Sequence, residues 1–255
     1  MVIEMQLQYA ALEAQVRAEL PAFMRLIEDI PYEPKGILYS EMFFLTLCAR
    51  AARPRRILES GRARAQSTLL LSRSFPDCEI ISVEYDRDSH DVAVAAERLR
   101  ECANVRQLFG DATRLLPQLS REGDVALIDG PKGYRGLRLA ARLLATRRVP
   151  LVFLHDAGCA SVERCFLEAR FPEALYSDDP RLAALTHVLD QGADPDIPVP
   201  NRWDNGPPAA GYGFGLACLP WRAGRSYRSV IARAALEGLA HRLARHAKAH
   251  GTRPG

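Results

Sequence analysis

Residues 57–68 read ILESGRARAQST, and this segment indicates how the chain folds. Its apolar start is typical of a buried strand, an acid and a glycine follow, and Ser67 and Thr68 open the next apolar segment. A strand that turns directly into a helix brings backbone N–H groups to one edge of a sheet, where an anionic group can bind. The segment therefore predicts a strand, a ligand-binding turn and a helix, and the hydroxyl of Ser67 can add a hydrogen-bond donor there.

The pattern around this segment predicts an α/β fold with a doubly wound, mostly parallel sheet. Short apolar runs at 57–59, 79–83, 105–108, 124–128 and 149–154 alternate with helical stretches. Such alternation is typical of parallel strands covered by helices, with ligands beyond the carboxyl ends of the strands. We expect helices before the sheet at 5–30 and 40–52, another helix at 161–171, and closing strands at 183–189 and 211–219.

Three parts follow from this pattern: an N-terminal helical cap (1–55), a Rossmann-like domain (56–220) and a helical tail (221–255). Five prolines and two glycines interrupt 190–210, and we interpret this stretch as a lid loop over the site. The tail holds eight basic residues against one acid, whereas the net charge of the whole chain is only +3. Its apolar positions, Ile231, Ala235, Leu239, Leu243 and Ala247, predict an amphipathic helix that docks on the domain or on a second subunit.

The composition is that of a soluble globular protein: 255 residues, 48% hydrophobic and 25% charged. No apolar run approaches the roughly 20 residues that cross a bilayer, and the first residues do not resemble a secretion signal. Six scattered cysteines without a C-x-x-C pair suggest reduced thiols. We therefore expect a cytoplasmic protein with no membrane partner; a homodimer is left open, and nucleic acid is not expected because the basic tail lacks interleaved aromatic residues.

The type of ligand is indicated by Glu84, which ends the next predicted strand after the turn. A carboxylate at such a strand end can accept hydrogen bonds from both hydroxyls of a ribose, so a nucleoside is expected. The dinucleotide fingerprint has glycine at the positions occupied here by Ala63 and Gln66, where side chains hinder approach to a pyrophosphate. A nucleoside without a pyrophosphate suits this turn better.

Several motifs in a fixed order carry a resemblance to a known family. They are LESG at 58–61 with Ser67 and Thr68, VEYD at 83–86, GDA at 110–112, LLPQL at 115–119, the segment 124–134, and LHD at 154–156. Over residues 38–158 the chain resembles class I S-adenosylmethionine-dependent methyltransferases, and within them the small O-methyltransferases of the catechol and caffeoyl-CoA type. The resemblance implies a Rossmann-like fold and methyl transfer from S-adenosylmethionine to a hydroxyl of a small molecule.

The resemblance also implies cofactor-binding residues. Gly61 and Ser67 would contact the methionine part of the cofactor, and Glu59 would support the loop or bind the amino group. Glu84 would hold the ribose, and Asp111 would lie near the adenine. Helix capping is the alternative role for Ser67 and for Asp111.

The segment IDGPKGY at 128–134 resembles the Asp-x-x-Lys element of the family. This implies Asp129 as a catalytic metal ligand and Lys132 as general base. Asp129 and Asp156 could hold Mg²⁺ or another divalent metal, but position 157 is alanine where the metal-dependent members have an asparagine ligand. His155 is an alternative base, an alternative nitrogen ligand for a transition metal, or a structural histidine.

Two arginines in the turn, Arg62 and Arg64, are interpreted either as a clamp for an anionic group of the substrate or as solvated surface residues. Two other functions stay open. One is a non-catalytic nucleoside-binding or scaffold protein of the same fold. The other is an NAD(P)-dependent oxidoreductase, which Ala63 and Gln66 disfavour.

Overall fold

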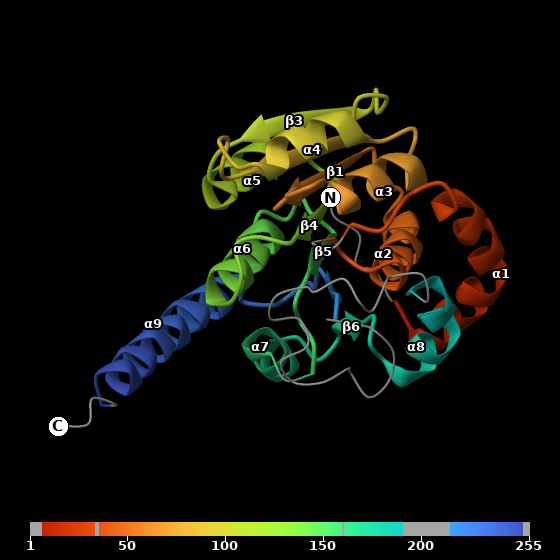
Figure 1. The fold of residues 1–255 in the computed structure, drawn as a ribbon. Coiled ribbons are helices and arrows are strands. Elements are labelled where there is room, and N and C mark those ends of the chain that lie inside the picture. Colours follow the sequence, from red (N-terminus) through yellow and green to blue (C-terminus); the bar gives the residue numbers. More distant parts are fainter. Residues whose placement is uncertain (1–6, 34–35, 160, 191–214, 252–255) are drawn as a thin grey trace.

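The computed structural model describes residues 7–33, 36–159, 161–190 and 215–251, with side chains up to residue 244. A seven-stranded sheet in the order β3-β2-β1-β4-β5-β7-β6 forms its centre (Figure 1). The strands are β1 (Arg56–Ser60), β2 (Glu79–Glu84), β3 (Val105–Phe109), β4 (Val125–Ile128), β5 (Leu151–Leu154), β6 (Leu175–Tyr176) and β7 (Ala217–Pro220). Strands β1 to β5 pair in parallel, while β7 is antiparallel to both of its neighbours. The predicted doubly wound, mostly parallel sheet is confirmed.

Helices cover both faces of the sheet. They are α1 (Tyr9–Ile27), α2 (Tyr39–Ala52), α3 (Gln66–Ser74), α4 (Asp91–Arg98), α5 (Ala112–Leu119), α6 (Tyr134–Ala145), α7 (Val162–Arg170), α8 (Pro180–Thr186), the 3-10 helix η1 (His187–Asp190) and α9 (Tyr227–Gly251). Successive strand residues point to opposite faces, so Ile57 packs with α1 to α4 and α8, whereas Leu58 packs with α5, α6, α7 and α9. Strands buried on both faces read as continuous apolar runs, which is why the sequence revealed them.

Helix α9 docks on α6 and then extends beyond it, away from the sheet (Figure 1). Its buried side chains are Tyr227, Val230 and Ala234. Leu239 and Leu243, which the sequence placed on the docking face, are 48% and 62% exposed. The predicted helix is confirmed, and its first turns dock on α6. Docking of Leu239 and Leu243 on a second subunit stays a prediction.

The predicted strand at 183–189 is also wrong, because this segment forms α8 and η1. The helix begins there because the Asp179 side chain accepts the backbone N–H of Arg181, and Pro180 occupies the first helical turn, where its missing N–H costs nothing. The predicted strand at 211–219 is confirmed in part: β7, the antiparallel strand of the sheet, covers 217–219 and extends to Pro220. The stretch interpreted as a lid, 190–210, lies outside the described residues apart from Asp190.

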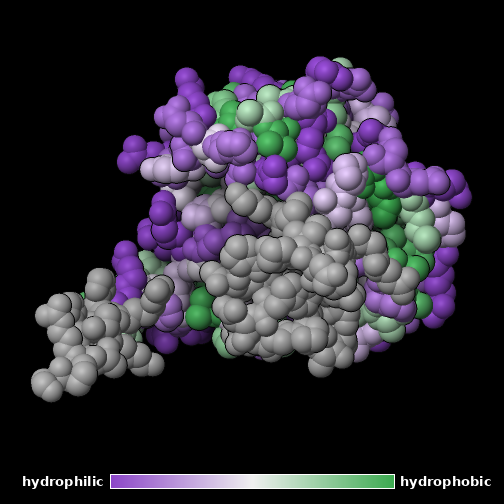
Figure 2. All heavy atoms as spheres, in the orientation of Figure 1, coloured by the Kyte–Doolittle hydropathy of each residue, from purple (hydrophilic) through white to green (hydrophobic). Residues whose placement is uncertain are grey.

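Over the part of the molecule formed by α4, β3 and α5, hydrophilic side chains enclose only small hydrophobic patches (Figure 2). In the described ranges no helix combines the length and apolarity needed to span a membrane. All six cysteines are free.

Candidate active site

The turn between β1 and α3 lies directly against the turn after β4. Gly61 has φ +87°, and a Cβ there would come within 2.8 Å of the backbone nitrogen of Gly130. Ala63 and Ala65 also have positive φ, 43° and 65°. The backbone of the turn is therefore held in conformations that favour glycine, and Gly61 is required by the close approach of the two turns.

Glu59, in the strand β1 that leads into this turn, stabilises the turn through hydrogen bonds. Its carboxylate is fully buried and accepts hydrogen bonds from the hydroxyls of Ser67 and Thr68, each at 2.5 Å. Burial raises the pKa of the Glu59 carboxyl, and the hydrogen bond from Ser67 opposes this effect. The Ser67 hydroxyl thus points to Glu59 and fixes the first turn of α3; a contact between Ser67 and a cofactor stays a prediction.

Glu84 lies at the end of β2, beside the same turn. One carboxylate oxygen accepts the backbone N–H of Ala63 at 2.7 Å, and the other accepts that of Tyr85 at 2.7 Å. The half-buried carboxylate is therefore held at the carboxyl edge of the sheet with oxygen lone pairs left for hydroxyl donors.

Asp111 caps α5, as the alternative interpretation expected. Its side chain accepts the backbone N–H of Thr113 at 2.9 Å and the Thr113 hydroxyl at 2.6 Å. The hydrogen bond from the Thr113 hydroxyl lowers the pKa of the Asp111 carboxyl. The side chain is partly exposed, so a position near a bound adenine stays a prediction.

The two arginines of the turn are engaged inside the protein. Arg62 is buried, donates to the carbonyl of Ser82 at 3.0 Å and lies over the ring of Phe109. Arg64 pairs with Glu33 at 2.6 Å. These contacts argue against the interpretation of this pair as a clamp for the substrate, and the burial of Arg62 also shows that it is not a solvated surface residue.

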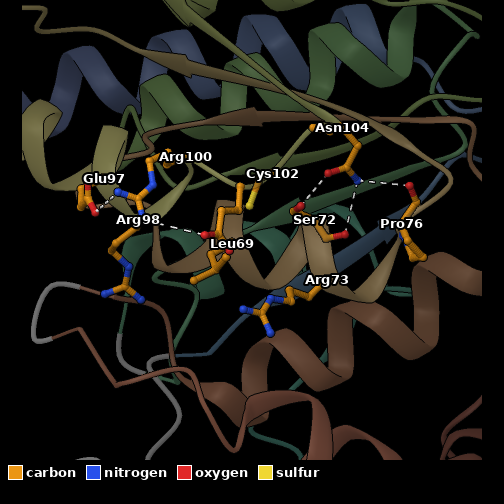
Figure 3. A pocket seen from close by; sticks show the side chains of 11 residues that line it. Leu69, Ser72, Arg73, Pro76, Glu97, Arg98, Arg100, Cys102 and Asn104 are labelled. Carbon is orange, nitrogen blue, oxygen red and sulfur yellow. Dashed lines mark hydrogen bonds and ion pairs between the residues drawn. The ribbon is translucent and has the colours of Figure 1, made fainter.

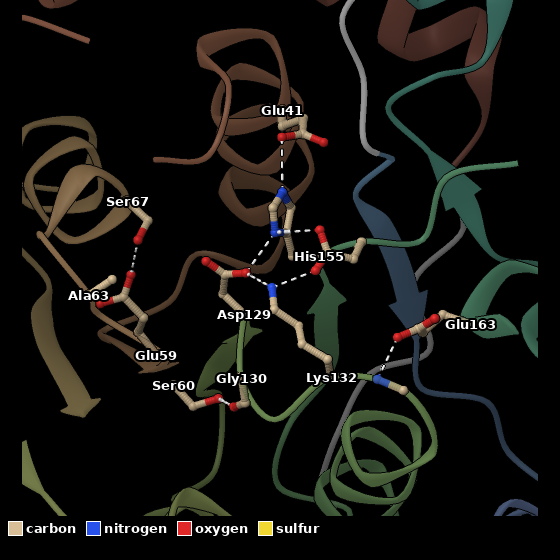
Figure 4. A network of polar contacts seen from close by, with 12 residues as sticks. Glu41, Glu59, Ser60, Ala63, Ser67, Asp129, Gly130, Lys132, His155 and Glu163 are labelled. Atoms are coloured by element: carbon tan, nitrogen blue, oxygen red, sulfur yellow. Dashed lines mark hydrogen bonds and ion pairs between the residues drawn. The ribbon is translucent and has the colours of Figure 1, made fainter. Parts of the chain in front are cut away.

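A network of acids and bases joins the ends of β4 and β5 to α2 (Figure 4). Nζ of Lys132 lies 2.5 Å from Oδ1 of Asp129 and 2.6 Å from Oδ2 of Asp156. Nδ1 of His155 lies 2.6 Å from Oδ1 of Asp129, and its Nε2 lies 3.1 Å from Oε2 of Glu41. The structure therefore brings together Asp129, Lys132, His155 and Asp156, which the sequence singled out.

Glu41 was missed by the sequence reasoning. It occupies the first turn of α2, is fully buried, and also accepts the backbone N–H of Leu38 at 3.1 Å. An acid next to the apolar run of residues 42–45 was the available signal, but a helix-capping role explains the same pattern. Its partner His155 is nearly 115 residues away, so the pairing becomes visible only in the fold.

Glu163 was missed as well. From the first turn of α7, its carboxylate accepts the backbone N–H of Gly133 at 2.5 Å. Gly133 has φ +66° and precedes α6. The contact fixes the loop that carries Lys132.

The charges in the network determine which groups hold protons. Burial alone would lower the pKa of His155, but the carboxylates of Asp129 and Glu41 raise it to about 10. Burial likewise opposes the charge of Lys132, but Asp129 and Asp156 raise its pKa above the usual range. The positive charges of His155 and Lys132 outweigh burial and hold the pKa of Asp129 well below its usual value. At neutral pH both bases are protonated, so neither can accept a proton in this state.

The same geometry bears on a metal. Donor atoms of Asp129, His155 and Asp156 lie within 4.8 Å of one another. Both carboxylates already contact the Lys132 ammonium, and protonated His155 has no lone pair to offer. Position 157 supplies no oxygen side chain. A divalent metal at this point would have to displace the Lys132 ammonium from both carboxylates, and Asp129 and Asp156 as metal ligands stay a prediction.

Two cavities differ in their relation to the network. The larger, of about 610 Å³, lies between α3 and the segment joining α4 to β3, and none of its lining residues belongs to the network (Figure 3). Its polar side chains contact one another: the Ser72 hydroxyl donates to Asn104 at 2.6 Å, and Arg100 pairs with Glu97 at 3.1 Å. A cavity of about 350 Å³ adjoins the network at Lys132.

No protein-family model and no curated protein matches the sequence significantly. Among solved structures, the chain is similar to the O-methyltransferase TomG from Streptomyces achromogenes, involved in tomaymycin synthesis and solved in complex with S-adenosylmethionine. The identity is 18%, the TM-score is 0.50, and the match covers 86% of this chain and 92% of that one. The chain is also similar to a candidate O-methyltransferase from Klebsiella pneumoniae, at 20% identity and a TM-score of 0.51, over 86% and 99% of the two chains. At these identities the likeness shows that the chain has the Rossmann-like fold of these two proteins.

Proposed function

We propose that the protein is an S-adenosylmethionine-dependent methyltransferase that acts on a hydroxyl of a small molecule. One observation carries the proposal: the carboxylate of Glu84, the turn at Gly61 and the network around Lys132 lie at the same carboxyl edge of the sheet. A nucleoside-binding group and a charged reaction site are thereby neighbours. The fold shared with TomG, which was solved with S-adenosylmethionine, supports the same cofactor.

In this proposal the cofactor lies along the carboxyl ends of β1, β2 and β3. Glu84 accepts hydrogen bonds from the ribose hydroxyls, and the backbone at Gly61 contacts the methionine part. Glu59 keeps the turn in place through Ser67. Asp111, at the start of α5, borders the adenine. The bound cofactor supplies an electrophilic methyl group on a sulfonium.

Lys132 and Asp156 act on the acceptor. Methyl transfer needs an acceptor oxygen that has lost its proton and lies in line with the methyl group. The Lys132 side chain is 52% exposed, so its ammonium can stabilise the negative charge that develops on this oxygen. The Asp156 carboxylate, also partly exposed, can accept the hydrogen bond of the acceptor hydroxyl and then its proton, so that the oxygen loses its proton to Asp156 as it takes the methyl group. This assigns Lys132 an electrostatic role in place of general base, because its pKa is raised.

His155 is a positioning residue in this scheme. It is 4% exposed, and its two ring nitrogens are engaged by Asp129 and Glu41. By donating to both carboxylates it fixes Asp129, which in turn holds the Lys132 ammonium. Glu41 comes from the proposed N-terminal helical cap, so that part contributes to the site.

Replacement of Glu84 tests the proposal. Glu84→Ala removes two charge-assisted hydrogen bonds to the ribose, and the loss of about 3 kcal/mol weakens S-adenosylhomocysteine binding by roughly a hundredfold. Asp86→Ala is the matched control, because Asp86 is an exposed acid two residues away and its loss changes the net charge equally. Calorimetry with both variants gives the affinities, and equal affinity of Glu84→Ala and wild type would contradict the assignment.

A further inference from the structure

The cavity of about 350 Å³ beside Lys132 has no role in the scheme above. It is bounded by the start of α6, the start of α7 and the middle of α9. Its position is set by close packing of α9 on α6: a Cβ on Gly238 would come within 2.8 Å of the Cβ of Tyr134. The space is thus framed by two helices in fixed contact.

Basic side chains dominate the polar part of the lining. Lys132, Arg135, Arg138, His241 and Arg242 line the cavity, and no aspartate or glutamate does. Among the described residues, Arg138 and Arg242 have no acidic partner. The larger cavity near α4 differs in this respect, because its Arg100 pairs with Glu97 and Glu101, which also line it. Uncompensated guanidinium groups around a concave site are suited to a carboxylate or a phosphate.

The remaining lining is apolar or aromatic. Ala234, Ala235 and Val162 supply aliphatic surface, and the Tyr134 ring lies 5.9 Å from the ring of His241. The α9 residues in the lining, such as Ala235 and Gly238, are small, so space remains between the aliphatic surface and the guanidinium groups. A ligand that fits both parts has a flat or apolar body and an anionic group.

The cavity reaches the proposed reaction site through one residue. Lys132 lines it and also contacts Asp129 and Asp156 through Nζ. A compound anchored by Arg138 and Arg242 can therefore extend its other end toward the Lys132 ammonium. We infer that this cavity binds the anionic group of the methyl acceptor, a small aromatic carboxylate or phosphate ester; the acceptor role, though not the anion site itself, rests on the proposed function.

Calorimetry with phenyl phosphate, benzoate and phenol tests the site. Phenyl phosphate and benzoate carry the aromatic body with either anion, and phenol is the uncharged control. The double variant Arg138→Gln/Arg242→Gln is compared with Arg17→Gln/Arg25→Gln, which removes the same charge from exposed positions on α1. Circular dichroism verifies that both variants fold.

We expect at least one of the anions to bind the wild type, and the cavity variant to bind it about tenfold more weakly or worse. The α1 variant should bind it as the wild type does, and phenol should bind much more weakly. Absence of anion binding to the wild type, or equal affinity in both variants, overturns the inference.

A parallel titration with S-adenosylhomocysteine separates this inference from the proposed function. If the cofactor product binds and neither anion does, the anion site is refuted while the methyltransferase proposal stands. If an anion binds through Arg138 and Arg242 and S-adenosylhomocysteine does not bind, the anion site is supported and its assignment to a methyl acceptor is refuted.

Discussion

Replacing Glu41 by glutamine tests the electrostatics of the network. Oε2 of Glu41 lies 3.1 Å from Nε2 of His155, and both side chains are buried. Glutamine keeps the shape and an acceptor oxygen, so the change mainly removes a charge. At an effective dielectric constant of about 20, two unit charges at this separation attract by roughly 5 kcal/mol, or about 4 pKa units as an upper limit. Because Asp129 still holds the other ring nitrogen at 2.6 Å, we expect the pKa of His155 to fall from about 10 by about 2 units.

The measurement is an NMR titration of the imidazole signals in wild type and Glu41→Gln. Glu19→Gln is the control, since Glu19 pairs with Arg50 at the surface, away from the network. The folded-state pKa of His155 is raised, so its stabilising contribution is complete below about pH 6.5 and is lost as the pH rises through about 10. In Glu41→Gln the pKa of His155 is lower, so its stabilising contribution should be lost completely at a lower pH than in the wild type. A wild-type pKa near the ordinary histidine value, or one that the variant leaves unchanged, would refute the reasoning.

Three further predictions concern the turn, a buried acid and the metal. Gly61→Ala should lower the free energy of unfolding by about 2 kcal/mol or more. Gly123→Ala is the control, because Gly123 has a similar φ but no atom within 4 Å of an added Cβ, and it should lower this free energy less. Equal losses of the two variants in denaturant titrations would contradict the prediction. Burial raises the pKa of Asp190 to about 7 from 3.8, so its ionisation destabilises the fold as pH rises through that interval. Asp190→Asn should therefore stabilise the protein by up to about 4 kcal/mol at pH 8 and little at pH 4 in urea unfolding, whereas equal effects at both would argue against it. Removing divalent metals with a chelator should leave S-adenosylhomocysteine affinity and methyl transfer unchanged, because the Lys132 ammonium already bridges the carboxylates; marked stimulation by Mg²⁺ would show the opposite.

Strands β1, β2, β4 and β5 could be predicted because they are buried, largely apolar runs bounded by turn residues, whereas the edge strand β3 is only partly buried and exposes Arg106 and Gln107. Strands β1 to β5 fall on the five predicted runs within two residues at each end. The run at 183–189 is also mainly apolar, yet it forms α8 and η1, and the capping pair Asp179 and Pro180 lies just before it. An apolar run alone does not distinguish a short helix from a strand.

The candidate site was predictable only where residues follow strands of the sheet. Asp129 and His155 come directly after β4 and β5, and neighbouring strand ends meet in space. Glu41 reaches the same point from a helix of the N-terminal part, a contact that depends on tertiary packing. The side chains of Arg62 and Arg64 turn inward to local acceptors and acids, which spacing along the chain does not reveal.

The most direct test of the proposed function is calorimetric titration of the full chain with S-adenosylhomocysteine and S-adenosylmethionine, with NAD⁺ as the control. The proposal predicts binding of both sulfur nucleosides with one site per chain and micromolar affinity, and no binding of NAD⁺. Absence of binding by either sulfur nucleoside, or binding of NAD⁺ in their place, would contradict it.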